Sequence, residues 1–411
     1  MQNARRSSLL HPLWLLLPLL VVLSACAPSV GIFASSSWQA ATLSHEHIRS
    51  MAVDPNNPQI VYAGDAQHGV FVSADGGTSW KQQQNGLSPG ATINALVFDA
   101  PGKKLYAASD AGIYASADGA KSWTKIEGLP QDNYTSIAFD LKKTQSIYVG
   151  SEQDGVFASS DSGATWTAAN SGLPATLTIH GLAFDSDAHQ LWAATSAGVY
   201  RSPDGGASWQ ALNTGLPAGI IIYAVLPASI EGGAQGLIYA ATNKGLFLSH
   251  DAAAHWKTSQ TSLARISIYG VLVDYHTVTT VYISTGIVGI LRSIDSGENW
   301  GGVASGLPSH QIVYAMAQGA ANYDQLFVAI NNIYLYPGTG SIFDPTQLLP
   351  FVLVIAFFYL LFRLSTRRRK ASRNMLKPER IIEPEDAHST GEMNKLPASS
   401  ENTDDNSEQD K

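Results

Sequence analysis

The sequence contains few charged residues and a single cysteine. Only 14% of its 411 residues are Asp, Glu, Lys or Arg, while it holds 36 glycines and 19 prolines. This composition excludes a coiled coil and favours many short strands joined by tight turns. Because Cys26 is the only cysteine, no disulfide can form within the chain. A chain of 411 residues is too long for one compact core, so we expect several domains or one repeat array.

Positive charge is also scarce over most of the chain. The formal net charge is −8, and residues 27–344 alone hold 13 basic and 23 acidic residues, a net charge of −10. An acidic body repels phosphate backbones. We therefore expect no nucleic acid among the partners.

The first 26 residues have the pattern of an export signal. Arg5 and Arg6 precede an apolar run over residues 13–23, and small residues follow. The tetrapeptide LSAC at residues 23–26 resembles the lipobox of bacterial lipoproteins, in which the cysteine thiol is acylated by diacylglycerol and becomes the new N-terminus. The resemblance implies a lipid anchor at Cys26. An uncleaved signal anchor is the alternative.

A second apolar segment lies near the other end of the sequence. Residues 345–364 make up 20 positions, which is enough for one transmembrane helix. A basic cluster at residues 367–370 follows and predicts a cytoplasmic location for residues 365–411, which we interpret as a disordered tail because they are polar and nearly lack aromatics. A buried core helix is the alternative to the transmembrane helix. The two ends together predict that residues 27–344 lie outside the cytoplasmic membrane of a bacterial cell.

Six copies of one octapeptide occupy the middle of the chain. They are SADGGTSW, SADGAKSW, SSDSGATW, SPDGGASW, SHDAAAHW and SIDSGENW. Their aspartates are separated by 43, 43, 43, 47 and 44 residues, a period typical of one propeller blade: Asp75, Asp118, Asp161, Asp204, Asp251 and Asp295. The octapeptides resemble the Asp box shared by sialidases, xyloglucanase-type glycosidases, sortilin-type receptors and the photosystem II stability/assembly factor family.

The residue types of the octapeptide predict a structural role. The aspartate can accept hydrogen bonds from backbone N–H groups of a hairpin turn, the glycine can take a positive φ, and the tryptophan can begin the next strand. A catalytic group is needed once, so a residue that reappears in every copy is expected to be architectural. In the fifth copy Ala253 and His255 replace the glycine and the Ser/Thr, so we expect that turn to be the least regular.

The repeats predict an all-β fold, a seven-bladed propeller. One unit contains four short strands, at residues 93–99, 104–109 and 112–116 and from Trp123 onward. Three further strands follow the sixth octapeptide without an octapeptide of their own, so the seventh blade lacks its outer strand. Trp38 lies 42 residues before Trp80, and we expect residues 38–43 to supply that strand and close the ring. A six-bladed ring with one degenerate unit is the alternative.

Two further patterns recur in the repeats, and their recurrence predicts turn roles. Gly-Leu-Pro follows the fourth strand, at Gly128, Gly172, Gly215 and Gly306. An aspartate ends the inner strand, at Asp54, Asp99, Asp140, Asp185 and Asp274.

The candidate binding site is one column of residues in the inner strands. We expect a site on the face opposite the octapeptides, at the mouth of the central channel. Aligning the seven inner strands gives one polar or aromatic position: Arg49, Asn94, Thr135, His180, Tyr223, Tyr269 and Tyr314. The residue two positions later is apolar, as at Met51, and regular strand alternation would place both on the same blade surface. The column could contact a peptide, a glycan or a cofactor tail; the alternative is that it only solvates the channel entrance.

Neither a metal nor a cofactor is predicted. His45 and His47 flank Glu46 and could share a metal on a strand, but no Cys/His spacing supports them, and a polar loop is the simpler interpretation.

The sialidase resemblance implies three arginines that bind a substrate carboxylate, together with a Tyr/Glu pair and an acidic partner. Only Arg49, Arg201, Arg265 and Arg292 occur between residues 27 and 345. Arg201 and Arg292 each directly precede an octapeptide serine, which puts them on the wrong face. Xyloglucanase-type enzymes use two facing propellers, and this chain has room for one. We therefore expect no catalytic residues.

The resemblance to the photosystem II stability/assembly factor family covers residues 35–337. It implies a seven-bladed propeller, often a lipoprotein, that docks membrane-protein subunits during assembly. The chain departs from that pattern in its acidic propeller and its C-terminal apolar segment. We expect a non-enzymatic, membrane-anchored, extracytoplasmic propeller that binds or scaffolds a protein or glycan partner. A sialidase-like glycoside hydrolase and a receptor that signals through residues 365–411 are the alternatives.

Overall fold

The computed structural model describes residues 37–336, apart from residues 42, 44–46, 100–102, 186, 229–235, 275–276, 278, 304–305, 309 and 320–324. The described residues form β-strands and one short 3-10 turn, η1 (Thr261–Leu263), and they contain no α-helix. No helix in this part of the chain is long and apolar enough to cross a membrane. The predicted signal with Cys26, the apolar segment 345–364 and the tail 365–411 lie outside the described residues.

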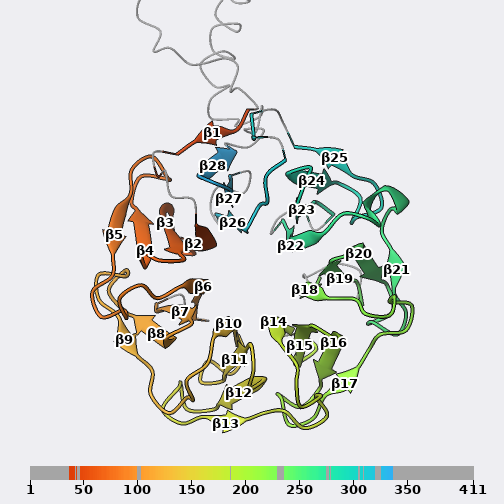
Figure 1. The fold of residues 1–411 in the computed structure, drawn as a ribbon, viewed down its shortest axis with the longest axis horizontal. Helices are drawn as coiled ribbons and strands as arrows, with labels where there is room; N and C mark the ends of the chain where they lie inside the picture. Colours follow the sequence, from red (N-terminus) through yellow and green to blue (C-terminus); the bar gives the residue numbers. More distant parts are fainter. Residues whose placement is uncertain are drawn as a thin grey trace, which may run out of the picture. The chain divides into compact units, whose positions relative to one another are not determined.

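Seven four-stranded antiparallel sheets, the blades, surround a central axis (Figure 1). The strands nearest the axis are β2 (Ile48–Asp54), β6 (Ile93–Phe98), β10 (Tyr134–Phe139), β14 (Ile179–Asp185), β18 (Ile222–Pro227), β22 (Ile268–Val273) and β26 (Ala315–Gln318). The second strands are β3 (Asn57–Asp65), β7 (Leu105–Ser109), β11 (Ile147–Ser151), β15 (Gln190–Thr195), β19 (Ile238–Thr242), β23 (Val281–Thr285) and β27 (Leu326–Ala329).

The outer half of each blade completes the sheet. The third strands are β4 (Val70–Ser73), β8 (Gly112–Ser116), β12 (Val156–Ser159), β16 (Gly198–Ser202), β20 (Gly245–Ser249), β24 (Ile290–Ser293) and β28 (Ile333–Tyr336). The fourth strands are β5 (Lys81–Gln83), β9 (Thr124–Lys125), β13 (Thr167–Ala168), β17 (Gln210–Ala211), β21 (Lys257–Thr258), β25 (Gly301–Gly302) and β1 (Gln39–Ala40). The predicted all-β, seven-bladed architecture is confirmed, and the six-bladed alternative is wrong.

The ring closes with a strand from the beginning of the propeller. β1 pairs with β28, with Gln39 opposite Leu335 and Ala40 opposite Tyr334. The ring of Trp38 packs 5.3 Å from that of Tyr336, and its indole N–H donates to the carbonyl of Val303 at 3.0 Å. Residues 39–40 therefore supply the outer strand of the seventh blade, within the predicted stretch 38–43, and remove an exposed sheet edge.

The core lies between neighbouring blades. Between the second and third blades, for example, Tyr106 and Ala108 of β7 are buried together with Tyr134 and Ile137 of β10. Seven such clusters of buried apolar side chains follow one another round the ring. The second strands are apolar on both sides because each is covered by a blade on either side.

Each octapeptide forms the turn between the third and fourth strands. In the first copy Asp75 accepts hydrogen bonds from the backbone N–H of Ser79 at 2.8 Å and from its hydroxyl at 2.6 Å, and Ser73 donates to the same carboxylate at 2.8 Å. The hydroxyl of Ser73 also accepts from the N–H of Gly77 at 2.8 Å. The predicted hydrogen bonds from the turn to the aspartate are therefore present.

The fifth octapeptide keeps this geometry, so the expectation that its turn is the least regular was wrong. The imidazole of His255 bonds to Asp251 at 2.8 Å, where the other turns use a hydroxyl or an amide, and its backbone N–H bonds at 2.9 Å. Ala253 takes φ 66°, and Ala120 of the second copy does the same. The hydrogen bonds and the neighbouring blade hold these alanines in the left-handed region at some conformational cost.

Both other recurring patterns have the predicted turn roles. Asp54 accepts from the N–H groups of Asn56 and Asn57 at 2.8 and 3.2 Å, and the aspartates that end the next inner strands bond their own turns likewise. Gly172, Gly215 and Gly306 lie against the backbone of the tryptophan in the following blade, whereas Gly128 lies against the ring of Trp166.

Candidate functional site

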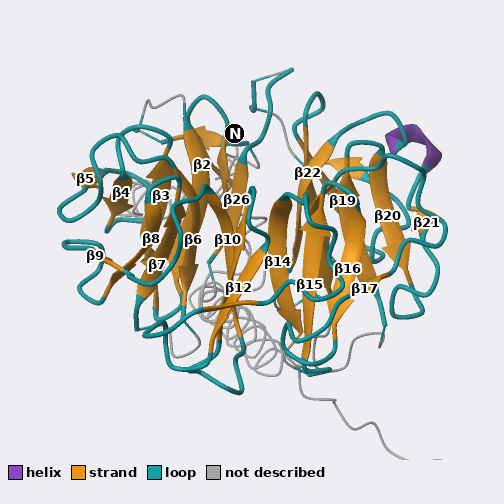
Figure 2. Cartoon of the chain, turned by 60° about the horizontal axis from the view of Figure 1, so that its bottom comes forward, coloured by secondary structure: helices purple, strands orange, loops and turns teal. Residues whose placement is uncertain are grey.

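The two faces of the propeller differ in which turns they carry. The octapeptide face holds the octapeptide turns and the turns between first and second strands. The opposite face, which we call the strand-start face, holds the first residues of the inner strands, the turns between second and third strands, and the links between blades, including η1 (Figure 2). All seven residues of the predicted column lie at the strand-start end of the inner strands, as expected.

Six of the seven column residues occupy a β-bulge. In β2, for example, Ile48 pairs with Asp65 and Ser50 pairs with Gly64, so Arg49 is the extra residue without a partner of its own in the ladder. The same shift occurs at Asn94, Thr135, His180, Tyr223 and Tyr269. Tyr314 directly precedes β26, and its N–H donates to the carbonyl of Ala329 at 2.9 Å.

The bulge corrects the expected side-chain directions. Leu96 packs toward the first blade in a cluster with Ile93, three residues earlier, while the amide of Asn94 donates to the carbonyl of Tyr134 in the third blade. Thus the column and the apolar residues two positions later point to different neighbours and do not share a blade surface, because one extra residue reverses the alternation.

Asn94 and Thr135 are engaged within the protein. The amide of Asn94 also donates to Oδ1 of Asn133 at 2.7 Å, and the hydroxyl of Thr135 donates to the carbonyls of Ile179 at 2.5 Å and Gly150 at 3.2 Å. These two residues link adjacent inner strands, so their first role is structural.

His180, Tyr223 and Tyr269 form an aromatic cluster on β14, β18 and β22, which stand side by side round the axis in Figure 1. The His180 and Tyr223 rings are 5.9 Å apart at 61°, and the Tyr223 and Tyr269 rings are 5.0 Å apart at 39°. We call these three residues the axial aromatic cluster. All three are half-buried, so each ring keeps surface that a ligand could cover.

Burial shifts the pKa values of two residues of this cluster, His180 and Tyr223. It lowers the pKa of His180, and the nearby carboxylate of Glu152 opposes that shift. Burial also raises the pKa of Tyr223, and Tyr269 adds to the effect. Burial therefore favours the neutral forms of His180 and Tyr223.

Sequence reasoning missed exposed apolar residues beside the cluster. The Tyr269 ring lies against Gly286, which begins the turn between β23 and β24, and the next two residues, Ile287 and Val288, are 56% and 54% exposed. Tyr314, in the following blade, is 50% exposed. The two consecutive apolar residues at this turn were the available signal, because no equivalent turn has such a pair; the seventh blade has the single residue Ile330, which is buried.

The arginines do not gather at one place. Arg49 and Arg265 are exposed on the strand-start face, on β2 and just before β22. Arg201 and Arg292 lie on β16 and β24 next to the octapeptide turns. The described residues also contain no group of three or more His, Cys, Asp or Glu side chains that could hold a metal ion.

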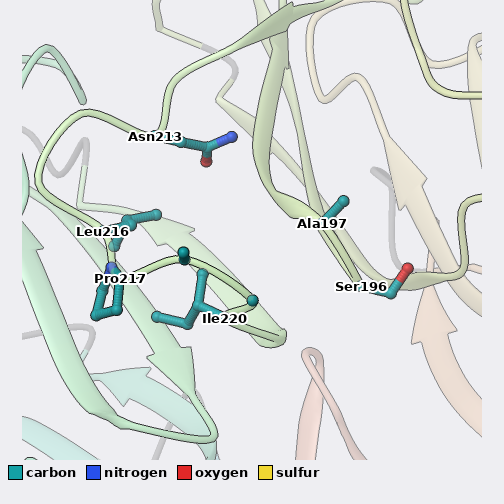
Figure 3. A pocket seen from close by; sticks show the side chains of 8 residues that line it. Ser196, Ala197, Asn213, Leu216, Pro217 and Ile220 are labelled. Carbon is teal, nitrogen blue, oxygen red and sulfur yellow. The ribbon is translucent and has the colours of Figure 1, made fainter.

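A cavity of about 340 Å³ lies on the strand-start face between the fourth and fifth blades (Figure 3). It is lined by Ser196, Ala197, Asn213, Leu216, Pro217, Ala218, Gly219 and Ile220. The Asn213 side-chain oxygen already accepts from the N–H of Val199 at 2.8 Å. None of these lining residues is titratable, so we assign no chemistry to this cavity.

Comparison with known proteins identifies the fold. Residues 30–151 match the model of a family described as the DUF6242 beta propeller domain, and no curated protein matches the chain. The GH74 xyloglucanase from Xanthomonas campestris is 16% identical with a TM-score of 0.60, over 75% of this chain and 55% of the enzyme. The likeness shows the fold alone.

Two further propellers are similar to the same degree. The extracellular domain of a protein described as a hybrid two component system from B. thetaiotaomicron is 15% identical with a TM-score of 0.60, over 73% of this chain and 39% of that one. YCF48 bound to a D1 peptide is 18% identical with a TM-score of 0.58, over 72% of this chain and 95% of that one. The chain thus spans just over half of the xyloglucanase and about two fifths of the B. thetaiotaomicron protein.

Proposed function

We propose that this chain is a membrane-anchored, extracytoplasmic propeller that binds a protein partner on its strand-start face and performs no chemistry of its own. The observation that carries the proposal is the axial aromatic cluster, which offers three half-buried rings from three successive blades beside exposed apolar residues. Partly exposed aromatic side chains on a rigid scaffold are typical of binding surfaces. Arg49, Asn94, Thr135 and Tyr314 border this surface.

One comparison supports a binding role. YCF48 has the same fold and was solved with a D1 peptide bound. A xyloglucanase shares the fold too, and this chain spans 55% of it. The four arginines of the propeller are spread over separate elements, which does not fit the arginine triad implied by the sialidase resemblance.

The proposed tethers lie at the two ends of the chain. Acylation at Cys26 and a helix over residues 345–364 would hold the propeller close to the bilayer and raise its effective concentration near membrane clients. Cys26→Ser should abolish labelling with a radioactive fatty acid. A reporter fused after residue 364 should be active only in the cytoplasm, and a reporter active outside would contradict the proposed topology.

Affinity purification tests the binding role. The full chain is solubilised from membranes, and the co-purifying proteins are identified by mass spectrometry for wild type and for Tyr223→Ala/Tyr269→Ala. We expect at least one membrane-complex subunit to be lost in the double variant. The control is Leu141→Ala/Ile294→Ala, which removes exposed apolar side chains from the octapeptide face. A partner profile that is the same in all three proteins would contradict binding at the cluster, and an empty profile would favour a glycan ligand.

A receptor that signals through residues 365–411 is a second candidate. The likeness of the propeller to the extracellular domain of a two component system supports it. Deleting residues 365–411 separates the two roles: a scaffold keeps its function without the tail, whereas a receptor loses it.

A further inference from the structure

We propose that the protein partner presents a lysine or arginine side chain and, several residues away in the same extended segment, an apolar one, and that this segment lies across the strand-start face from the third blade to the sixth. This inference rests on the proposed function, because it describes the partner of the same surface. The side chains that carry it form a band: Asn133, Glu152, His180, Tyr223, Tyr269, Ile287 and Val288.

The band has a continuous set of contacts. The amide of Asn133 donates to Oε2 of Glu152 at 2.8 Å, and the hydroxyl of Thr178, two residues before His180, donates to the backbone carbonyl of Glu152 at 3.0 Å. His180 leads to Tyr223 and Tyr269 by ring contacts. Tyr269 lies against Gly286, which precedes the exposed pair Ile287 and Val288. An acidic end thus passes through aromatic rings to an apolar end.

The loops at the acidic end carry negative charge. At residues 126–133, 152–155, 169–178 and 196–197 they hold four acidic residues and no lysine or arginine, while Lys125, just before the first of them, lies against Gly112 of the second blade. Glu152 is exposed, and among the described residues it forms no salt bridge and its Oε1 accepts no hydrogen bond. A cation from the partner would complete the pair.

Tyrosine rings continue the band beyond the acidic end. Tyr223 contacts His180, and Tyr269 contacts Tyr223. The faces of tyrosine rings attract ammonium and guanidinium groups within about 6 Å. The band therefore offers basic side chains a carboxylate at one end and aromatic surface along its length. An anionic lipid surface or a nucleic acid would be repelled by Glu152, and a neutral glycan would leave its carboxylate without a partner charge.

The apolar end requires an apolar side chain of the partner. Ile287 and Val288 are exposed next to each other, and Tyr314 of the next blade is exposed as well. Covering such side chains removes apolar surface from water, which favours association. An extended segment is the natural occupant, because its successive side chains reach neighbouring blades in turn.

The test uses two peptide libraries that differ in one group. Both carry randomised positions on either side of a fixed central residue, which is arginine in one library and its neutral isostere citrulline in the other. The full chain, purified in detergent, is exposed to each library, and the bound peptides are quantified. We expect about tenfold more binding of the arginine library and an enrichment of apolar residues at randomised positions several residues from the arginine, on one side of it.

Glu152→Gln is the variant that isolates the charge, because glutamine still accepts a hydrogen bond from Asn133. It should remove the preference for arginine over citrulline. Asp187→Asn, which neutralises an exposed carboxylate on the octapeptide face, should keep that preference. Ile287→Ser/Val288→Ser should remove the enrichment of apolar residues at the randomised positions of the bound peptides.

The outcomes separate this inference from the proposed function. Equal binding of the two libraries, lost in Tyr223→Ala/Tyr269→Ala, would overturn the inference and leave the binding surface in place. Binding of neither library would also overturn the inference, and the affinity purification would then decide the proposed function by itself.

Discussion

A methyl group on Gly215 would lie 2.3 Å from the carbonyl oxygen of Trp256. Gly215 belongs to the link between the fourth and fifth blades, and Trp256 ends the octapeptide turn of the fifth blade. The N–H of Trp256 also donates to the carbonyl of Thr214 at 2.9 Å. The Gly-Leu-Pro motif therefore does more than turn the chain, because its glycine lets the link lie directly on the outer strand of the next blade.

Gly215→Ala should destabilise the propeller by about 2–4 kcal/mol, because it combines a positive φ with a clash against backbone. The matched control is Gly219→Ala in the same link, where φ is +64° and no atom lies within 4 Å of the added methyl group. That variant should cost only about 1 kcal/mol. Chemical denaturation of both variants measures the difference, and equal losses would contradict the contact.

Trp38→Ala should cost about 3–5 kcal/mol, because it removes a large buried side chain at the point where the ring closes. Gln39→Ala is the control, since Gln39 lies in the same short strand but is exposed. Urea unfolding followed by tryptophan fluorescence checks both variants. A Trp38 variant as stable as the Gln39 variant would show that β1 does not hold the ring closed.

The octapeptide aspartates predict loss of stability in acid. Hydrogen bonds from the hydroxyl and N–H of Ser79, and from Ser73, lower the pKa of Asp75 to about 2, and those from Thr165 and Ser159 do the same for Asp161. A pKa lowered by folding means that the stabilisation is complete above the unfolded value near 4 and is lost as pH falls toward 2. The melting temperature should therefore drop between pH 4 and pH 2.

The acid effect can be assigned with Asp161→Asn. This variant cannot ionise, and its single carbonyl oxygen can replace only Oδ1 of Asp161, which accepts from Ser159 and from the N–H of Thr165. Its melting temperature should be lower than that of the wild type at neutral pH but should change less between pH 4 and pH 2. An identical pH dependence in the two proteins would contradict the role of this carboxylate.

His180 predicts a second pH dependence of folding stability, between pH 7 and pH 5. Burial lowers its pKa below the ordinary value near 6.5, so the unfolded chain binds a proton at a pH where the folded chain does not. Folding stability should thus fall as pH drops below about 6.5 and rise again toward neutrality. His180→Gln should show a smaller loss between pH 7 and pH 5, and comparing the two slopes cancels the contributions of the other histidines.

Most of the candidate site followed from aligned inner strands, but its geometry did not. The alignment selected His180, Tyr223 and Tyr269, which the structure brings into ring contact. The bulge at each of these residues was missed. The sequence contains an indication of it, because Ile48 and Met51 are buried in the same cluster although they are three residues apart, whereas regular alternation in a strand would require an even spacing. Ile287 and Val288 were missed because their exposure depends on how the turn between β23 and β24 is placed in the folded blade.

The repeat, the number of blades and the turn chemistry follow from local patterns along the chain. The bonds of an octapeptide join residues at most four positions apart, as between Asp75 and Ser79, so their pattern is visible in the chain itself. The tertiary structure alone decided which side chains meet on the strand-start face. His180 and Tyr223 are 43 positions apart, and only the twist and bulge of adjacent inner strands turn them toward each other.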